Sequence, residues 1–226
     1  MFLWESSDKQ TPVTPETALA GRDAPVLPSP APHAVLGTDI LAEPGPDQEV
    51  LYLASGCFWG AEKFAWELGA DATAVGYMGG FTPNPTYEEV CTGKTGHTET
   101  VRVLYAPSRL PTERLLQAFF ESHDPTSLNR QGNDVGTQYR SAVFPTTSQQ
   151  EELARRMIEA YQEVLDNNGF GKIVTEVTPA LEVGPFYPAE DCHQQYLDKN
   201  PNGYQCHART GMACPLPGAG PAATGR

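Results

Sequence analysis

The order of hydrophobic and polar residues predicts alternating strands and helices along most of the chain. Residues 50–54 form a short apolar run typical of a buried strand. In the segment that follows, Trp59, Lys63 and Trp66 are spaced four and three residues apart, which predicts a helix with these residues on one side. Residues 98–105 alternate apolar with polar types and include several β-branched side chains, so they predict a second strand.

Two longer helices are predicted further along the chain. Residues 111–122 begin with a proline and have one apolar face, which comprises Leu115, Leu116, Phe119 and Phe120. Ser148 and Glu151 have the spacing of a capping box, so we expect Ser148 to start a helix that ends at Asn168-Gly169. Its inward face is expected to comprise Leu153, Met157, Tyr161 and Leu165. Residues 173–177 predict a further strand.

This alternation predicts an α+β fold, a two-layer sandwich around a mixed β-sheet with a ferredoxin-like core and long loops. Residues 1–48 carry eight prolines, a density that excludes helices and central strands. We expect this Pro-rich segment to be an extended arm, either loose or laid over the surface. The main α+β domain is assigned to residues 49–200, and residues 201–226 are expected to be a flexible C-terminal tail, frayed from Pro215 onwards.

Charge and hydropathy exclude several function classes. The 15 Lys and Arg residues against 28 Asp and Glu residues give a net charge of −13. Such a surface repels nucleic acid and anionic lipid, so neither is expected as a partner. No apolar run approaches the length of a membrane-spanning helix, and the first residues lack the pattern of a signal peptide. We expect a soluble, cytoplasmic protein, and a monomer.

The five cysteines are expected to be free thiols. Their number is odd and no export signal is seen, so a structural disulfide framework is disfavoured. None of them pairs at the spacing of a zinc site, and His97 and His193 lack partners at ligand spacing, so no metal and no cofactor are predicted. Redox or nucleophilic roles remain for the cysteines, with inert burial as the alternative for each.

Cys57 is the first candidate for chemistry. It follows a predicted strand and the Ser55-Gly56 turn, which places its sulfur near the N-terminus of the next helix. Unpaired N–H groups and the helix dipole stabilise an anion there, so we expect the pKa of the thiol to be lowered. The alternative is a packed cysteine between aromatic neighbours.

Four blocks of sequence resemble the A-type peptide methionine sulfoxide reductases at matching spacing. They are Gly56-Cys57-Phe58-Trp59-Gly60, residues 76–87 continuing to Gly96-His97-Thr98-Glu99, residues 131–141, and residues 189–196. The resemblance covers about residues 50–204, and the Pro-rich arm is also similar to that of some bacterial members.

The resemblance implies that Cys57 attacks the sulfur of a methionine sulfoxide. Glu99 would protonate the sulfoxide oxygen, which requires an apolar setting that keeps its carboxyl protonated. Tyr87 and Tyr139 would donate hydrogen bonds to the S=O group, and Asp134 would bind substrate or intermediate through hydrogen bonds or a water.

Substrate binding and stereochemistry follow from the same resemblance. Phe58 and Trp59 would form the apolar pocket for the methyl group on sulfur. Because such a pocket places the methyl group and the oxygen on opposite walls, it accepts one configuration at sulfur, and the family takes the S epimer. The substrate would be free methionine sulfoxide or the oxidised residue in a peptide or protein.

The resemblance also implies a way to recycle the enzyme. The sulfenic acid left on Cys57 would condense with Cys206, and Cys214 would then exchange to give a Cys206–Cys214 disulfide that thioredoxin reduces. The sequence departs from many relatives here: an extra residue precedes Cys206, and Gly211 is the only glycine between the two cysteines, where many relatives are Gly-rich. This leaves their order of action open. Cys91 and Cys192 are expected to be bystanders.

Two other interpretations compete with this one. A thiol peroxidase could also use Cys57 and Cys206, but a peroxide site needs no methyl pocket and is helped by a nearby arginine. An acidic binding module would leave the helix position of Cys57 and the cysteine spacing unexplained.

Overall fold

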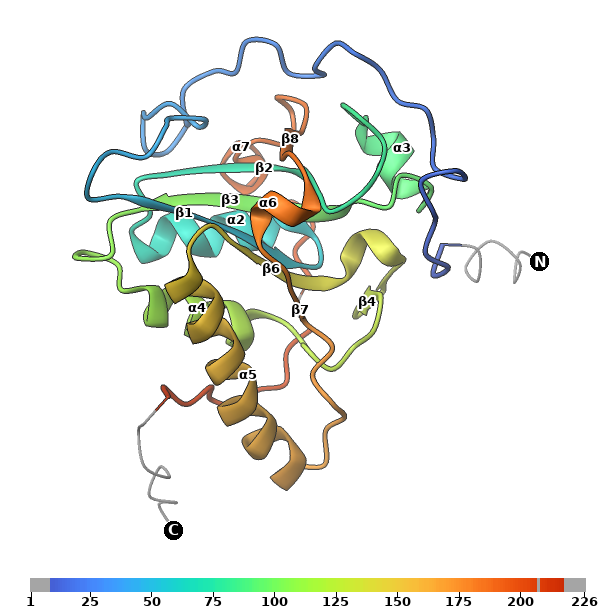
Figure 1. The fold of residues 1–226 in the computed structure, drawn as a ribbon. Coiled ribbons are helices and arrows are strands. Elements are labelled where there is room, and N and C mark those ends of the chain that lie inside the picture. Colours follow the sequence, from blue (N-terminus) through green and yellow to red (C-terminus); the bar gives the residue numbers. More distant parts are fainter. Residues whose placement is uncertain (1–8, 207, 218–226) are drawn as a thin grey trace.

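The computed structural model describes residues 9–206 and 208–217, drawn in Figure 1. At its centre is a six-stranded mixed sheet with the strand order β7-β6-β1-β3-β2-β8. β6 and β7 pair in parallel, and the other neighbours pair antiparallel. The strands are β1 (Glu49–Ser55), β2 (Ala72–Met78), β3 (Thr98–Tyr105), β6 (Ser141–Pro145), β7 (Glu176–Val177) and β8 (Tyr187–Pro188).

Three helices cover one face of this sheet: α2 (Phe58–Leu68), α4 (Thr112–Ser122) and α5 (Ser148–Asn167). The order β1-α2-β2-β3-α4-β6 with adjacent strands β6-β1-β3-β2 is the ferredoxin-like arrangement, so the predicted α+β class is confirmed. The loops contain the short helices α3 (Tyr87–Cys91), η1 (Thr137–Tyr139), α6 (Ala180–Val183) and α7 (Tyr196–Lys199). A second, two-stranded sheet joins β4 (Arg130–Gln131) to β5 (Asp134–Val135).

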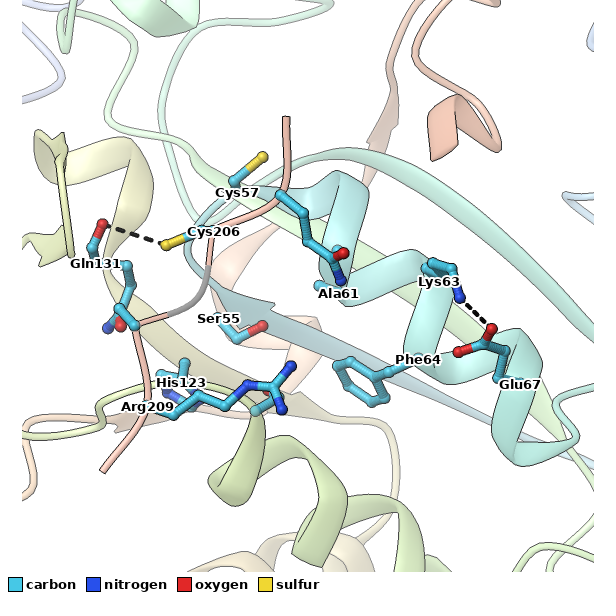
Figure 2. Close-up of a pocket in the computed structure, with 14 residues that line it drawn as sticks. Ser55, Cys57, Ala61, Lys63, Phe64, Glu67, His123, Gln131, Cys206 and Arg209 are labelled. Carbon is cyan, nitrogen blue, oxygen red and sulfur yellow. Dashed lines mark hydrogen bonds and ion pairs between the residues drawn. The ribbon is translucent and has the colours of Figure 1, made fainter. Parts of the chain in front are cut away.

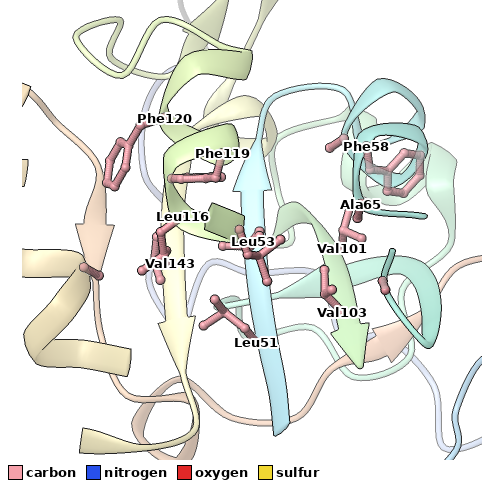
Figure 3. Close-up of a cluster of buried hydrophobic side chains, with 14 of the residues drawn as sticks. Leu51, Leu53, Phe58, Ala65, Val101, Val103, Leu116, Phe119, Phe120 and Val143 are labelled. Atoms are coloured by element: carbon pink, nitrogen blue, oxygen red, sulfur yellow. The ribbon is translucent and has the colours of Figure 1, made fainter. Parts of the chain in front are cut away.

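The main core lies between the sheet and the three helices (Figure 3). It includes Leu51, Leu53, Val101, Val103 and Val143 from the sheet, and Phe58, Ala65, Leu116, Phe119 and Phe120 from the helices. Alternate residues of a strand point to opposite faces, yet all eight residues of β3 are buried. The other face is therefore covered too, in part by a second cluster around Met78 and Phe144. This burial of both faces makes β3 a central strand that holds polar side chains away from water.

The three predicted helices are confirmed with small differences at the ends, and so are the apolar faces of α4 and α5. The buried face of α2 differs from the side predicted at Trp59, Lys63 and Trp66; it comprises Phe58, Ala61, Glu62, Ala65 and Trp66. The cap of α5 is Thr147, whose hydroxyl accepts the N–H of Gln150, so the predicted cap at Ser148 was one residue late. α5 ends before Asn168-Gly169 as predicted. The strand predicted at 173–177 is wrong in length, because only Glu176–Val177 pairs with β6.

Residues 9–48 lie against the domain as an extended segment, in which the structure places neither helix nor strand. In Figure 1 this segment, drawn in blue, runs on the side of the sheet away from α4 and α5. Two of its side chains, His33 and Ile40, are almost fully buried. Of the two arrangements open from the sequence, a loose arm or one laid on the surface, these residues adopt the second. Within the described part of the chain, no helix is long and apolar enough to span a membrane.

Candidate active site

Cys57 lies at the junction of β1 and α2. The strand ends at Ser55, Gly56 turns the chain with a φ of 87°, and Cys57 is the N-cap of α2. A Cβ at position 56 would lie 2.6 Å from Cγ of Gln131, so only glycine fits both the dihedral angle and the close approach. The predicted position of the thiol at a helix N-terminus is confirmed.

The predicted direction of the Cys57 pKa shift is wrong. Burial is the largest influence and raises the pKa of the thiol above its usual range, and the charge of the Glu99 carboxylate raises it further. The helix start does act as expected, because the backbone N–H of Trp59 lowers the pKa, but its effect is smaller. In the free protein the thiol is therefore protonated, and a thiolate requires that its proton be transferred and that Glu99 carry no charge.

Glu99 lies on β3 directly beside this helix start. Its side chain is 1% exposed, and its Oε2 accepts the N–H of Phe58 at 2.9 Å. Burial raises the pKa of the carboxyl to about 8, against the lowering effect of that N–H, and the charge of Asp134 adds to the increase. The carboxyl is thus mainly protonated at neutral pH, which is the state that the predicted proton donor requires.

Two tyrosines surround Glu99 from different loops. Tyr87 is the first residue of α3, and Tyr139 ends η1. Burial, followed by the charge of Glu99, raises the pKa of both phenols. Both therefore remain protonated hydrogen-bond donors next to the carboxyl, as the resemblance implies.

Aromatic rings form a wall beside Cys57. Phe58 is 1% exposed, with its ring 6.4 Å from those of Trp59 and Tyr87. The half-buried ring of Trp59 stacks on Tyr196 at a centroid distance of 3.9 Å. His193 lies 4.3 Å from the Tyr87 ring and accepts a 3.3 Å hydrogen bond from Nε1 of Trp59. The structure thus brings the predicted pocket residues together, and Trp59 presents the larger free surface.

Three residues near this wall were given no role in the sequence analysis: Glu190, His193 and Tyr196. Glu190 accepts the backbone N–H of Tyr87 at 2.8 Å and the hydroxyl of Tyr77 at 3.1 Å, so it fixes the start of α3. All three belong to the block at residues 189–196, which carried the resemblance but was given no function. That block was the available signal.

Asp134 contacts the C-terminal segment. Its Oδ2 accepts the hydroxyl of Tyr204 at 3.0 Å, and burial raises the pKa of its carboxyl. The charge of Asp134 acts on both Cys57 and Glu99, so it belongs to the same site.

Cys206 lies in the same segment, where the chain crosses beside the start of α2 (Figure 2). Its thiol donates to the carbonyl oxygen of Gln131 at 3.5 Å. Cys57 and Cys206 both line a cavity between α2 and the segment that contains Gln205 and Arg209. The structure thus brings the predicted nucleophile and one predicted recycling cysteine together.

Cys214 lies away from this cavity, in the main core beside α4. Its backbone N–H donates to Glu121 at 2.8 Å, and its carbonyl accepts from Gln117 at 2.6 Å. Burial raises the pKa of its thiol to about 12. The segment around it is anchored to α5, because the Tyr161 hydroxyl bonds the Thr210 hydroxyl and donates to the Met212 carbonyl.

The other two cysteines have different surroundings. Cys192 is exposed, whereas Cys91 ends α3 beside Tyr87 and is half-buried. All five cysteines are free. Within the described residues, no group of histidine, cysteine or carboxylate side chains could hold a metal ion.

A partly buried cysteine at a helix start, a protonated carboxyl beside it and a second cysteine in the same cavity define a thiol-dependent redox site. The family model described as "Peptide methionine sulfoxide reductase" matches residues 49–214. The chain is 53% identical over 205 residues to peptide methionine sulfoxide reductase MsrA of Corynebacterium kroppenstedtii, covering 89% of this chain and 93% of that protein. The MsrA of Vibrio cholerae is 52% identical over 209 residues, covering 92% and 97%.

Solved structures agree with this match. Methionine sulfoxide reductase A of Corynebacterium diphtheriae superposes with a TM-score of 0.81 at 49% identity, covering 91% of this chain and 98% of that one. Mxr1 of Saccharomyces cerevisiae in reduced form has a TM-score of 0.67 at 36% identity, covering 74% and 94%. The chain therefore belongs to the peptide methionine sulfoxide reductase family.

Proposed function

We propose that the protein reduces methionine S-sulfoxide, free or in oxidised proteins, to methionine, and so repairs oxidative damage. The observation that carries this proposal is the contact of Glu99 with the start of α2, where a carboxyl with a pKa of about 8 lies beside Cys57. A sulfoxide oxygen is a poor leaving group until it is protonated. A protonated acid beside a thiol supplies the proton and the nucleophile at one place.

In the first step the sulfur of Cys57 bonds to the sulfoxide sulfur while Glu99 gives its proton to the oxygen. The thiol proton of Cys57 replaces the one that Glu99 has lost. The protonated oxygen then moves from the substrate sulfur to the Cys57 sulfur while the bond between the two sulfurs breaks, so Cys57 becomes a sulfenic acid and the substrate leaves as methionine. Sulfur in the substrate is reduced by two electrons, and Cys57 is oxidised by two.

Tyr87 and Tyr139 hold the sulfoxide oxygen in this step. Both phenols stay protonated beside Glu99, so each donates to the oxygen as negative charge develops on it. The methyl group lies against Phe58 and Trp59. With oxygen and methyl on opposite walls, the S epimer alone presents its sulfur to Cys57.

Recycling begins in the cavity that Cys57 shares with Cys206. The Cys206 thiol attacks the sulfenic acid, a disulfide forms and water leaves. Asp134 lies next to Cys206 and accepts a hydrogen bond from Tyr204, and it binds the substrate or the intermediate.

Cys214 completes the relay only after it leaves its place in the core. Its thiol must reach the Cys57–Cys206 disulfide, so the segment from Thr210 to Cys214 must detach from α4 and α5. The exchange restores the Cys57 thiol and leaves a Cys206–Cys214 disulfide in a C-terminal tail, residues 201–226, for thioredoxin to reduce. Residues 49–200 form the catalytic domain and residues 1–48 the arm. Five free thiols suit a reducing compartment, so we assign the protein to the cytoplasm, as a monomer.

The test is turnover of the separate S and R epimers of a methionine sulfoxide peptide, first with dithiothreitol and then with thioredoxin. We expect methionine from the S epimer alone and none from the Cys57→Ser variant. Turnover with dithiothreitol but not with thioredoxin would contradict the relay and leave the nucleophile in place. A folded protein with free thiols that reduces neither epimer would contradict the function.

A further inference from the structure

The family model begins at residue 49, so the extended segment that precedes it lies outside the region that defines the family. We propose that part of this segment, residues 9–23, is a positioning element of the active site, with Arg22 holding Tyr87. The proposal rests on the proposed function of Tyr87 as a donor to the sulfoxide oxygen. Its basis is a set of contacts between residues 9–23 and the two loops that bear the tyrosines.

Arg22 binds the loop of Tyr87 by a forked contact. Its two terminal nitrogens donate to both carboxylate oxygens of Glu89, at 2.9 and 2.8 Å, and Nη1 also donates to the carbonyl of Asn84 at 2.7 Å. Arg22 also lowers the pKa of the Glu89 carboxyl, and its hydrogen bond is the largest influence on that pKa. A guanidinium suits this geometry because its planar fork matches a carboxylate.

The loop returns hydrogen bonds to the same part of the arm. Nδ2 of Asn84 donates to the carbonyls of Arg22 and Asp23, at 2.9 and 3.1 Å. The hydroxyl of Thr82 donates to the carbonyl of Leu19 at 2.8 Å. Arg22 N–H donates to the Pro83 carbonyl at 3.1 Å. Because both backbone and side chains take part, the arm and the loop are fixed against each other along several residues.

Glu89 transmits this contact to Tyr87. The same carboxylate accepts the N–H of Thr86 at 2.9 Å, and the Thr86 hydroxyl accepts the N–H of Glu89, so the two form the capping box of α3. Tyr87 is the first residue of that helix. A five-residue helix depends on its cap and its tertiary contacts, so the Arg22–Glu89 pair sets where the Tyr87 ring lies.

Lys9, the first described residue of the arm, contacts the second tyrosine loop. The carbonyl of Lys9 accepts the N–H of Thr137 at 2.9 Å, and Thr137 is the first residue of η1, which ends at Tyr139. The Lys9 backbone also packs on Gly93, two residues beyond α3, where a Cβ would lie 3.1 Å from it. Residues 9–23 thus bridge the two loops that carry the phenol donors, and neither loop has a long helix or strand to hold it.

The test is a double-mutant cycle between Arg22→Ala and Tyr87→Phe, with S-epimer turnover measured with dithiothreitol. A small displacement of a group that acts in the transition state is costly, so we expect Arg22→Ala to lower kcat about tenfold with little change in KM. In the Tyr87→Phe background the same substitution should change kcat less than about twofold, since the phenol is already gone. Arg22→Lys should lower kcat almost as much as Arg22→Ala, because an ammonium group cannot make the forked contact.

Arg109→Ala is the matched control. Arg109 also pairs with a carboxylate, that of Asp71, at an exposed place outside the active site, and kcat should stay unchanged. Alkylation of Cys57, followed by mass spectrometry, should proceed at the same rate in the Arg22→Ala variant, while amide exchange over residues 86–91 should become faster. An unchanged kcat for Arg22→Ala, or an equal loss in both backgrounds, would overturn the inference. Full activity of Tyr87→Phe alone would overturn both the inference and the proposed function of Tyr87.

Discussion

The backbone N–H of Phe58 donates to Oε2 of Glu99 at 2.9 Å, so the first amide of α2 binds the carboxyl beside the candidate nucleophile. A single N–H favours the carboxylate form, yet burial outweighs it and the pKa rises to about 8. The helix start acts on Cys57 through the N–H of Trp59, where burial again has the larger effect. In the free protein the Glu99 carboxyl is therefore mainly protonated at neutral pH, ready to protonate the oxygen of a bound sulfoxide.

The first prediction concerns the pH dependence of catalysis. Since Glu99 must be protonated to act, kcat/KM of the free protein should fall as pH rises through about 8. Glu99→Gln should lower kcat by about 10² to 10³, because its amide donates a hydrogen bond but no proton. Steady-state turnover of the S epimer from pH 6 to 10 measures both effects. If kcat/KM of Glu99→Gln still fell near pH 8 as in the wild type, another group would be responsible for that fall.

The second prediction concerns the effect of Glu99 on stability. The folded pKa of about 8 lies above the ordinary value of 4.5, so between these pH values the folded protein holds a proton that the unfolded chain has lost. Stability must then fall as pH rises from 4.5 to 8, by about 4 kcal/mol for this group alone. Glu99→Gln removes this dependence. Urea unfolding at pH 5 and pH 9 should show a smaller difference for the variant than for the wild type, and equal differences would contradict the pKa.

Much of the fold follows from hydrophobic periodicity, but two central elements were not assigned. β2 includes Gly76 and small side chains that give no clear alternation, although all seven of its residues are buried. The glycine is required by the neighbouring strand, because a Cβ there would lie 2.3 Å from the carbonyl oxygen of Tyr187. β6 has only three consecutive apolar residues, Ala142, Val143 and Phe144, before Pro145, which is too few to predict a strand. Such contacts between distant segments are not visible in a local window of sequence.

The sequence predicted which residues form the candidate site, but it did not predict how burial shifts their pKa values. The turn at Gly56 indicated a helix start at Cys57, and the motif blocks supplied Glu99 and the two tyrosines. The pKa of Cys57 was predicted in the wrong direction, since the helix is a local feature and burial depends on the whole fold. A glutamate in an alternating strand is usually exposed, and only the cover on both faces of β3 explains why Glu99 is not.

The third prediction concerns Glu62, a fully buried carboxyl on α2. It accepts the Thr73 hydroxyl and both the backbone and side-chain N–H groups of Gln195, the residue before Tyr196. Glu62→Gln replaces one acceptor oxygen by a donor, which leaves a buried N–H without an acceptor and should cost about 1–3 kcal/mol of stability.

Urea unfolding at pH 4.5 measures this loss, because at that pH the raised Glu62 pKa of about 7 costs the wild type almost no stability and cannot mask the effect of the lost acceptor. Glu67→Gln on the same helix is the control. Glu67 is exposed and pairs with Lys63, so its replacement should change stability by less than about 0.5 kcal/mol. Loss of the Gln195 contacts should also move the adjacent Tyr196, so its ring should stack less closely on Trp59, and tryptophan fluorescence measures this change. Equal stability of the two variants would show that Glu62 is not a structural acceptor.

The fourth prediction tests whether Cys214 is released from the core during recycling. Tyr161 anchors its segment through Thr210 and Met212. Tyr161→Phe removes both contacts, worth about 1 kcal/mol together, so the detached form should become about fivefold more populated. Alkylation of Cys214 in the reduced protein, followed by mass spectrometry, should accelerate by the same factor, because the thiol reacts only when it leaves the core.

Tyr105→Phe is the control for this experiment, since its buried hydroxyl bonds Thr112 and Gln150 and touches no part of the tail. It should lose comparable stability without changing the alkylation of Cys214. Turnover with thioredoxin should rise in Tyr161→Phe if detachment limits the relay, while the single turnover that oxidises Cys57 should not change. Unchanged alkylation of Cys214 in Tyr161→Phe would mean that these contacts do not control the detachment, and an equal acceleration in Tyr105→Phe would mean that global unfolding exposes the thiol.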